Sequence, residues 1–249
     1  MINLKTQLLK LKPLGVVGIK QSTEDEGALQ EDISLMRDIT RSCDLKLSVK
    51  IGGCEANTDI SFCNNIEVNG MVAPMVESEF ALQKFTESVA NVRNKNFYIN
   101  IESSNAITNL DSILNSASFK LLEGVVIGRS DLAKSYGYGK GMVDSKEMQS
   151  LVYKTLKTCK NHKTTTLMGG NISCDSISFI QKLYSENLLD FIETRNVIIE
   201  LNKYNINNLY DVICDAIKFE AAWLEFKASK YLDYGNQYKE RASAIKRRL

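Results

Sequence analysis

Short runs rich in β-branched and apolar residues alternate with segments of helical periodicity, and this alternation is the strongest constraint on the fold. Most of the runs are apolar on both faces, which is typical of parallel strands covered by helices. The seven runs predicted as strands are Leu14–Ile19, Leu45–Ile51, Gly70–Val76, Asn96–Glu102, Glu123–Gly128, Thr164–Met168 and Leu189–Thr194. The pattern predicts a parallel α/β architecture, either a TIM barrel or a doubly wound sheet.

The chain of 249 residues contains two prolines and no visible repeat, low-complexity segment or linker. We therefore expect a single domain over residues 1–249. From residue 205 to residue 249 the sequence is largely helical, with two apolar stripes. One stripe is Leu209, Ile213, Ile217 and Leu224, and the other is Val212, Ala216, Phe219, Trp223 and Phe226. A helix that is apolar on two sides is buried on two sides. We expect one stripe to pack on the barrel and the other on a second subunit, with burial inside one chain as the alternative.

Composition excludes several classes of function. The net charge of +1 produces no long-range field, so neither nucleic acid nor a membrane is expected as a partner. The six cysteines form no C-x-x-C pair and His162 is the only histidine, which argues against zinc sites and a Ser-His-Asp triad. No apolar stretch is long enough for a signal sequence or a membrane span. These features predict a reduced, cytoplasmic protein.

Polar residues collect where the predicted strands end, which is where parallel α/β proteins carry their chemistry. Glu102 and Asp131 follow strands that are neighbours in sequence and therefore in space. A carboxylate in such a position is often only a helix N-cap, and Asp131 fits that interpretation equally well. If both face one pocket, two hard oxygen ligands with room for water and substrate describe a Mg²⁺ or Mn²⁺ site.

Three basic residues also lie at strand ends: Lys20, Lys50 and Arg195. An arginine that points into a barrel mouth needs an anionic partner. Arg195 therefore either holds a distal substrate carboxylate or pairs with Glu193 or Glu26. Lys20, at the end of the first run, is a further candidate for substrate binding.

Three segments in this order resemble one known family. They are GMVAPMVES at residues 70–78, INIESSNAITNLDSIL at residues 99–114 and EGVVIGRSDLAKSYG at residues 123–137. Together they are similar to the HpcH/HpaI aldolase and citrate lyase β-subunit family, and weaker similarity extends from about residue 17 to residue 171. The glutamate and aspartate motifs are fairly specific in combination, although neither is specific alone.

The resemblance implies a TIM barrel that binds a divalent metal and a 2-oxo acid such as pyruvate. It also implies that the neighbouring carbon–carbon bond is made or broken through an enolate. In this sequence Glu102 and Asp131 resemble the two metal ligands, and the backbone NH groups of Ser130 and Asp131 resemble those that hold the substrate carboxylate. Glu26 resembles the family's strand-end glutamate.

The chain departs from the family at three places. Gly27 stands where aldolases of the family carry a histidine, so the usual base is missing. Lys50 replaces an arginine that steadies the enolate oxygen, which keeps the charge but loses the planar fork. The chain begins with a helix-like segment, Leu4–Leu11, in place of the opening strand. Either Val197–Leu201 helps to close the barrel or the barrel is irregular.

The sequence therefore predicts a metal-dependent carbon–carbon lyase or aldolase of TIM-barrel fold with a long C-terminal helix. Lys50 and Glu26 are the catalytic candidates. Ser130, Asp131, Arg195 and Lys20 are the candidates for substrate binding. Two alternatives stay open: citrate-lyase-like chemistry on an acyl-thioester, and a family member that has lost catalysis and acts as a binding protein. A dimer-based homo-oligomer is expected.

Overall fold

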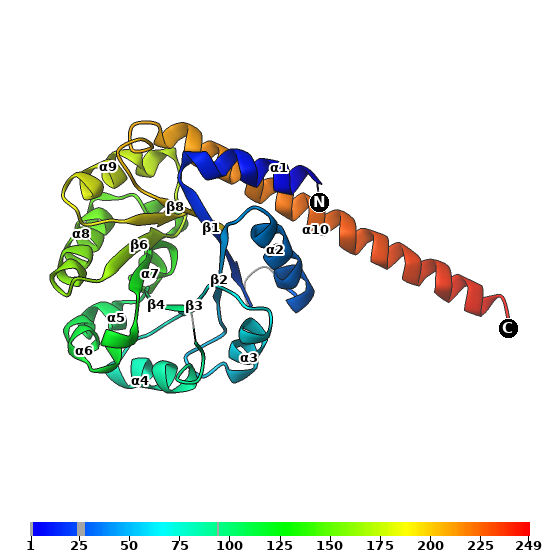
Figure 1. The fold of residues 1–249 in the computed structure, drawn as a ribbon, viewed down its shortest axis with the longest axis horizontal. Coiled ribbons are helices and arrows are strands. Elements are labelled where there is room, and N and C mark those ends of the chain that lie inside the picture. Colours follow the sequence, from blue (N-terminus) through cyan, green and yellow to red (C-terminus); the bar gives the residue numbers. More distant parts are fainter. Residues whose placement is uncertain (1, 24–27, 94) are drawn as a thin grey trace.

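The computed structural model describes residues 2–23, 28–93 and 95–249. Within these residues, eight strands close into a barrel in sequence order (Figure 1). The strands are β1 Val16–Ser22, β2 Lys46–Lys50, β3 Gly70–Ala73, β4 Asn96–Ile101, β5 Gly124–Gly128, β6 Thr165–Gly169, β7 Phe191–Glu193 and β8 Val197–Glu200. The predicted TIM-type barrel is confirmed.

The barrel is irregular at β8, which runs antiparallel to both β7 and β1. Only residues 194–196 separate β7 from β8, which is too short for the crossover that a parallel strand needs. Val197–Leu201 was suggested to help close the barrel, with an irregular barrel as the alternative; β8 closes the barrel and also makes it irregular. Glu220 of the C-terminal helix stabilises the turn by accepting hydrogen bonds from the Thr194 hydroxyl at 2.5 Å and the Asn196 amide at 2.6 Å.

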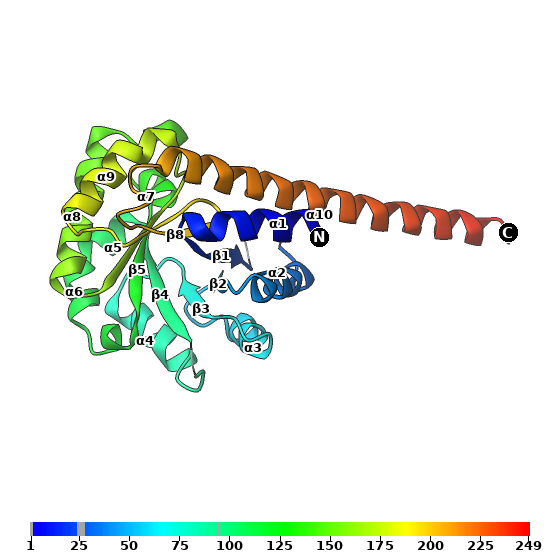
Figure 2. The same ribbon diagram turned by 45° about the horizontal axis from the view of Figure 1, so that its top comes forward.

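Helices surround the barrel (Figures 1 and 2). The α-helices are α1 Ile2–Leu11, α2 Gln30–Ser42, α3 Asn57–Asn65, α4 Glu79–Ser88, α5 Ser104–Thr108, α6 Leu110–Asn115, α7 Arg129–Ser135, α8 Lys146–Asn161, α9 Ile177–Ser185 and α10 Leu209–Lys246. Short 3₁₀ turns are η1 Lys12–Leu14, η3 Ser118–Leu121, η4 Lys140–Met142 and η5 Cys174–Ser176. None of the helices in the described residues is long and apolar enough to cross a membrane.

Apolar side chains fill both sides of the barrel wall. The larger core lies between strands and helices, and a small cluster of Val72, Val126, Leu167 and Ile198 lies inside the barrel. Because side chains alternate along a strand, Gly128 and Gly169, two positions beyond Val126 and Leu167, also face inwards. On β4, Tyr98 packs against the same cluster, so Asn100 and Glu102 face inwards at the barrel mouth.

The C-terminal helix α10 runs beside α1 and then projects beyond the barrel (Figures 1 and 2). Its second predicted stripe is buried from Val212 to Trp223, whereas Ile217 and Leu224 of the first stripe are about two-fifths exposed. The first stripe is therefore buried at Leu209 and Ile213 and partly exposed from Ile217 onwards. The uncovered part is the surface on which a partner was expected.

A buried ionic cluster fastens α10 to α2. Asp32 of α2 has no exposed surface and accepts hydrogen bonds from Tyr231 and, at 3.1 Å, from Lys230; the ammonium of Lys227 lies 3.4 Å away. Burial alone would raise the pKa of Asp32, but the bonds from Tyr231 and Lys230 and the charge of Lys227 outweigh it and lower the pKa below its ordinary value. The ionised form of Asp32 is therefore the one that holds the two helices together.

Asp32→Asn should lower the free energy of unfolding near neutral pH by about 3 kcal/mol or more, because it leaves the buried ammonium group of Lys227 without its counter-charge, whereas Lys230 keeps Glu31 as a partner. A carboxyl group whose pKa falls on folding stabilises the fold above its unfolded pKa and stops doing so as the pH drops through the folded pKa. Urea unfolding should therefore show the parent and the variant converging below about pH 4. Asp44→Asn, which removes a surface pair with Lys12, is the matched control and should change stability little. A pH-independent difference would contradict this assignment.

Candidate functional site

A pocket of about 470 Å³ opens at the carboxyl ends of β2 to β5. Its lining residues are Lys50, Gly52, Gly53, Cys54, Pro74, Met75, Glu102 and Asp131. The structure thus brings together Lys50, Glu102 and Asp131, three residues singled out from the sequence, from three different elements. Glu26, the other catalytic candidate, lies outside the described residues.

Glu102 is the buried carboxylate of the pocket, with 3% of its surface exposed. The Met75 amide donates to its Oε1 at 3.0 Å and the Asn100 side-chain amide donates to its Oε2 at 2.8 Å. Burial raises the pKa of Glu102; these two hydrogen bonds and the charge of Lys50 oppose that rise, and Asp131 adds to it. Lys50 and Asp131 are therefore close enough to Glu102 to act on its charge.

Sequence analysis missed Asn100 and Met75 as partners of Glu102. A signal for Asn100 was present, because it is a polar residue between two isoleucines, two positions before Glu102, and so faces the same way. Met75 contributes only its backbone, in a left-handed conformation with φ of 53° that no sequence pattern indicates. Such a conformation costs free energy in a residue other than glycine, so its occurrence beside the pocket is notable.

Gly128 makes room for the Glu102 carboxylate. A Cβ atom at Gly128 would lie 2.5 Å from Oε2 and 2.9 Å from Cβ of Glu102. The backbone at Gly128 has φ of −86°, so an alanine would be excluded by the carboxylate and not by backbone strain. The conformation of Glu102 therefore depends on the absence of a side chain on the neighbouring strand.

Gly128→Ala should displace the Glu102 carboxylate and weaken Mn²⁺ binding roughly 10-fold to 100-fold, the range found when the support of a metal ligand is lost. Isothermal titration calorimetry with MnCl₂ measures this. Gly139→Ala is the matched control, because a Cβ there meets nothing within 4 Å. Parental affinity in Gly128→Ala, with a native circular dichroism spectrum, would show that Glu102 needs no such space.

Asp131 is exposed and lies in the first turn of α7, one residue after Ser130, which is also exposed. Amide groups in the first turn of a helix have no partner within the helix. Gly170 lies against this turn: its φ is +83°, and a Cβ there would be 2.5 Å from the Ser130 nitrogen. Gly170 therefore allows both a tight turn and the close approach of its backbone to the Ser130 nitrogen.

Arg129 is a fully buried residue that sequence analysis did not single out. Its guanidinium contacts Asp144 at 2.6 Å and the Ser176 hydroxyl at 3.0 Å. It also donates to the carbonyl groups of Gly169 and Gly170. Burial lowers the pKa of Arg129, and Asp144 opposes that effect. Because Arg129 begins α7, this network fixes the turn that carries Ser130 and Asp131.

Lys50 is the last residue of β2, and an ordered loop follows it. Asp59 of α3 accepts hydrogen bonds from the Gly52 amide at 2.8 Å and the Thr23 hydroxyl at 2.6 Å. The Thr23 amide in turn donates to the Lys50 carbonyl at 3.0 Å. The backbone around Lys50 is therefore held on both sides, while its side chain lines the pocket.

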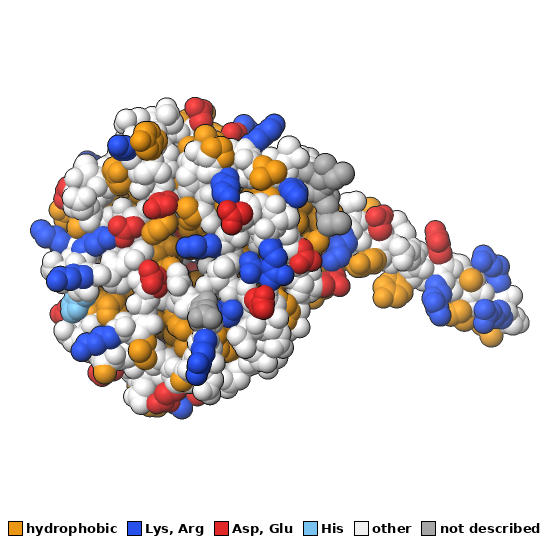
Figure 3. Space-filling view, in the orientation of Figure 1, with side chains coloured by type: hydrophobic (Ala, Val, Ile, Leu, Met, Phe, Trp, Pro, Cys, Tyr) orange, Lys and Arg blue, Asp and Glu red, His pale blue; other side chains and the backbone are white. Residues whose placement is uncertain are grey.

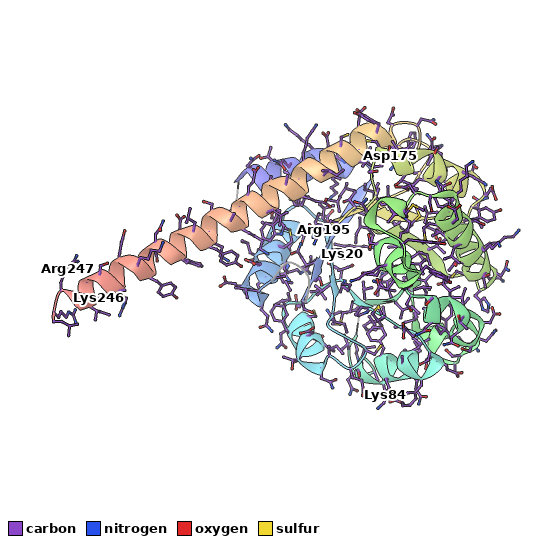
Figure 4. The ribbon with its side chains drawn as sticks, turned by 180° about the vertical axis from the view of Figure 1, so that it is seen from behind. Lys20, Lys84, Asp175, Arg195, Lys246 and Arg247 are labelled. Atoms are coloured by element: carbon purple, nitrogen blue, oxygen red, sulfur yellow. The ribbon has the colours of Figure 1, made fainter. Side chains whose placement is uncertain are left out.

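Lys20 and Arg195 lie on another part of the barrel mouth, near β1 (Figure 4). Lys20 forms an ion pair with Glu193 of β7, whose side chain is 1% exposed. Glu193 therefore has a cationic partner on β1. Arg195 itself is exposed in the turn between β7 and β8. Neither residue lines the pocket of Glu102 and Asp131.

His162 lies far from the pocket along the barrel axis. It ends α8, just before β6 begins, and its half-buried ring packs edge-on against Phe119. Figure 3 shows the histidine, in pale blue, at the rim of the molecule. The only histidine of the chain therefore cannot take part in chemistry at the carboxyl ends of the strands.

The donor set at the pocket suits a hard divalent cation. Glu102 and Asp131 offer carboxylate oxygens on neighbouring elements, and the absence of a side chain at Gly128 makes room for the Glu102 carboxylate itself. Mg²⁺ is commonly bound by one or two carboxylates and keeps several water molecules. No cluster of three or more His, Cys, Asp or Glu occurs in the part of the chain that the structure describes, so a closed all-protein cage is not formed there.

Comparisons with known proteins bear on the family and the fold. Residues 38–170 match the family described as HpcH/HpaI aldolase/citrate lyase. The search of curated proteins finds no match.

Solved structures show the same fold at low sequence identity. A protein of the HpcH/HpaI aldolase/citrate lyase family from Burkholderia cenocepacia J2315 has a TM-score of 0.62 at 11% identity, over 76% of this chain and 82% of that one. Citrate synthase SbnG has a TM-score of 0.59 at 13% identity, over 86% and 98%. RipC from Yersinia pestis has a TM-score of 0.54 at 18% identity, over 77% and 87%.

Proposed function

This chain belongs to the HpcH/HpaI aldolase/citrate lyase family, and from this premise we propose that it is a divalent-metal-dependent carbon–carbon lyase or aldolase. Family membership supports the lyase or aldolase type of function. The finer proposal is that the reaction passes through the enolate of a pyruvate-like 2-oxo acid. The observation that carries it is the pocket in which Glu102, Asp131 and Lys50 meet.

Glu102 and Asp131 are the residues that would hold Mg²⁺ or Mn²⁺. The cation, when bound, supplies Lewis-acid polarisation of the 2-oxo group and stabilises the charge of the enolate. Asn100 and Met75 hold the Glu102 carboxylate in one orientation through their hydrogen bonds. Lys50 places an ammonium group at the same pocket, where it favours negative charge on the enolate oxygen.

We propose that the amides of Ser130 and Asp131 receive the substrate carboxylate, as the family resemblance implies. Arg195 and Lys20 stay candidates for a more distant acidic group, on the other part of the barrel mouth (Figure 4). Glu26, the other catalytic candidate, and Gly27 lie outside the described residues. Since His162 is remote, proton transfer must use another group.

A turnover screen tests the substrate class. The protein with Mn²⁺ is given free 4-hydroxy-2-oxo acids in one series and acyl-thioesters such as malyl-coenzyme A in another. Cleavage of free 2-oxo acids alone supports the proposal. We expect this cleavage to be slow, because Gly27 stands where the family's aldolases carry a histidine. Cleavage of thioesters alone would replace it with citrate-lyase-like chemistry. Metal binding without turnover in either series would favour the non-catalytic alternative.

The projecting half of α10 supports a dimer-based homo-oligomer. Leu224, Tyr238 and Ile245 are 42%, 75% and 53% exposed and are separated by multiples of seven residues, so they share one face of the helix. Apolar residues that recur at this spacing on one exposed face of a helix favour pairing with another helix. We also propose a cytoplasmic location, because the six cysteines are free.

Light scattering at micromolar concentration should report a dimer or a larger closed assembly for the parent. The double variant Tyr238→Glu and Ile245→Glu should dissociate it, because it places charges on the shared face while leaving the barrel untouched. Lys239→Glu is a matched control for added charge on an adjacent position. A monomeric parent would contradict the assembly proposed here.

A further inference from the structure

Two cysteines that are distant in sequence lie side by side near the start of α10. The Sγ atoms of Cys174, in η5, and Cys214, in the second turn of α10, are 3.9 Å apart. Both side chains are partly exposed. Figure 4 shows the neighbouring residue Asp175 beside the first turns of α10, where the two elements pack together.

The separation of the two sulfur atoms is within reach of a covalent bond. A disulfide has an S–S length of about 2.05 Å, so the atoms must approach by roughly 2 Å. Rotation of the two side chains and a small adjustment of the short η5 turn can supply this. Neither residue is fixed inside a regular strand of the barrel.

The remaining cysteines offer no comparable site. Cys63 and Cys159 have no exposed surface, and burial raises the pKa of each to about 12, which keeps these thiols protonated and unreactive. Cys54 is partly exposed at the pocket, and burial raises its pKa as well. Burial, Cys214 and Asp175 also raise the pKa of Cys174, so its reaction with disulfides should be faster above neutral pH.

We infer that Cys174 and Cys214 form a dithiol site that small-molecule disulfides such as oxidised glutathione convert to an intramolecular disulfide joining η5 to α10. One protein thiolate attacks the glutathione disulfide, forming a mixed disulfide and releasing one glutathione thiolate. The second protein thiolate then attacks the protein sulfur of the mixed disulfide and releases the other. Two protein thiols are oxidised, one glutathione disulfide is reduced, and the two protons pass to the two glutathione thiolates.

The proposed disulfide is connected to the candidate site through two side chains, Ser176 and Arg129. Ser176, two residues after Cys174, bonds to the buried guanidinium of Arg129 at 3.0 Å and to Asp144 at 2.9 Å. Arg129 begins the helix that carries Asp131. The oxidation state of the pair therefore acts on the loop that supports the turn at the pocket, independently of which substrate the pocket takes.

The test incubates the reduced full-length protein with oxidised glutathione and follows its intact mass. The expected result is the loss of two hydrogen atoms without a lasting glutathione adduct, and a peptide map that links residues 174 and 214. The oxidised protein should melt roughly 5 °C or more above the reduced one, because the bond closes a long loop, and a thiol reductant should reverse the shift.

Cys214→Ser should instead keep one glutathione group on Cys174 and show no rise in melting temperature. Cys54→Ser is the matched control and should form the disulfide like the parent. A parent that takes up glutathione but never closes the internal bond would overturn the inference. A bond that maps to other cysteines, or that disappears in Cys54→Ser, would do so as well.

Discussion

Glu102→Gln and Asp131→Asn are each expected to abolish Mn²⁺ binding measured by calorimetry, while the circular dichroism spectrum stays native. Each substitution preserves the shape of the side chain and replaces an anionic oxygen ligand by a neutral amide. With two protein carboxylates at the site, the loss of either removes half of the protein's ligand charge. Glutamine has only one side-chain oxygen, so in Glu102→Gln the NH₂ group faces one of the two donors, the Met75 amide or the Asn100 side chain.

Asp175→Asn is a matched control for the metal experiment, since Asp175 is also an exposed aspartate at the start of a helical turn but lies outside the pocket. It should bind Mn²⁺ like the parent. If Glu102→Gln and Asp131→Asn both retain the affinity of the parent, Asp131 is only a helix-start residue and the metal is bound elsewhere.

Lys50→Met should lower turnover of the true substrate by roughly 10²-fold or more, the scale found for single electrostatic groups at developing oxyanions. The methionine retains most of the length of the side chain and removes the charge that acts on Glu102 at the pocket. The KM for the substrate should change less than kcat, because the charge matters most when the enolate forms.

Lys50→Arg separates charge from shape in the same position. It introduces the guanidinium that the family resemblance implies at this position, and we expect it to retain a large part of the turnover that Lys50→Met loses. Near-parental turnover in Lys50→Met would mean that Lys50 is a strand-end lysine whose charge the reaction does not use.

The alternation of strands and helices predicted a parallel α/β fold, and the family resemblance selected the barrel. Strands that follow one another along the chain become neighbours, so Glu102 after β4 and Asp131 after β5 reach one pocket. The orientation of β8 was not foreseen, because it depends on the short turn at residues 194–196 and on Glu220 from a distant helix.

Contacts between oppositely charged residues that are distant in the chain could not be predicted from the sequence either. Lys20 pairs with Glu193 and Arg129 with Asp144, and no periodicity connects either pair. The two stripes of α10 were recognised, but the division of one stripe between Ile213, which is buried, and Leu224, which is exposed, depends on where the helix leaves the barrel. The spacing of apolar residues predicts which face of a helix is apolar, but how much of that face is buried depends on the packing of the whole chain.

The exchange of pyruvate methyl protons for deuterium tests the central claim most directly, because it reports formation of the enolate without requiring the natural substrate. In D₂O with Mn²⁺ the parent should catalyse this exchange at a measurable, modest rate. A chelator should stop it, and Glu102→Gln should not show it. Complete absence of exchange in the parent, with Mn²⁺ shown to be bound by calorimetry, would contradict the proposed chemistry and leave a metal-binding protein without enolate catalysis.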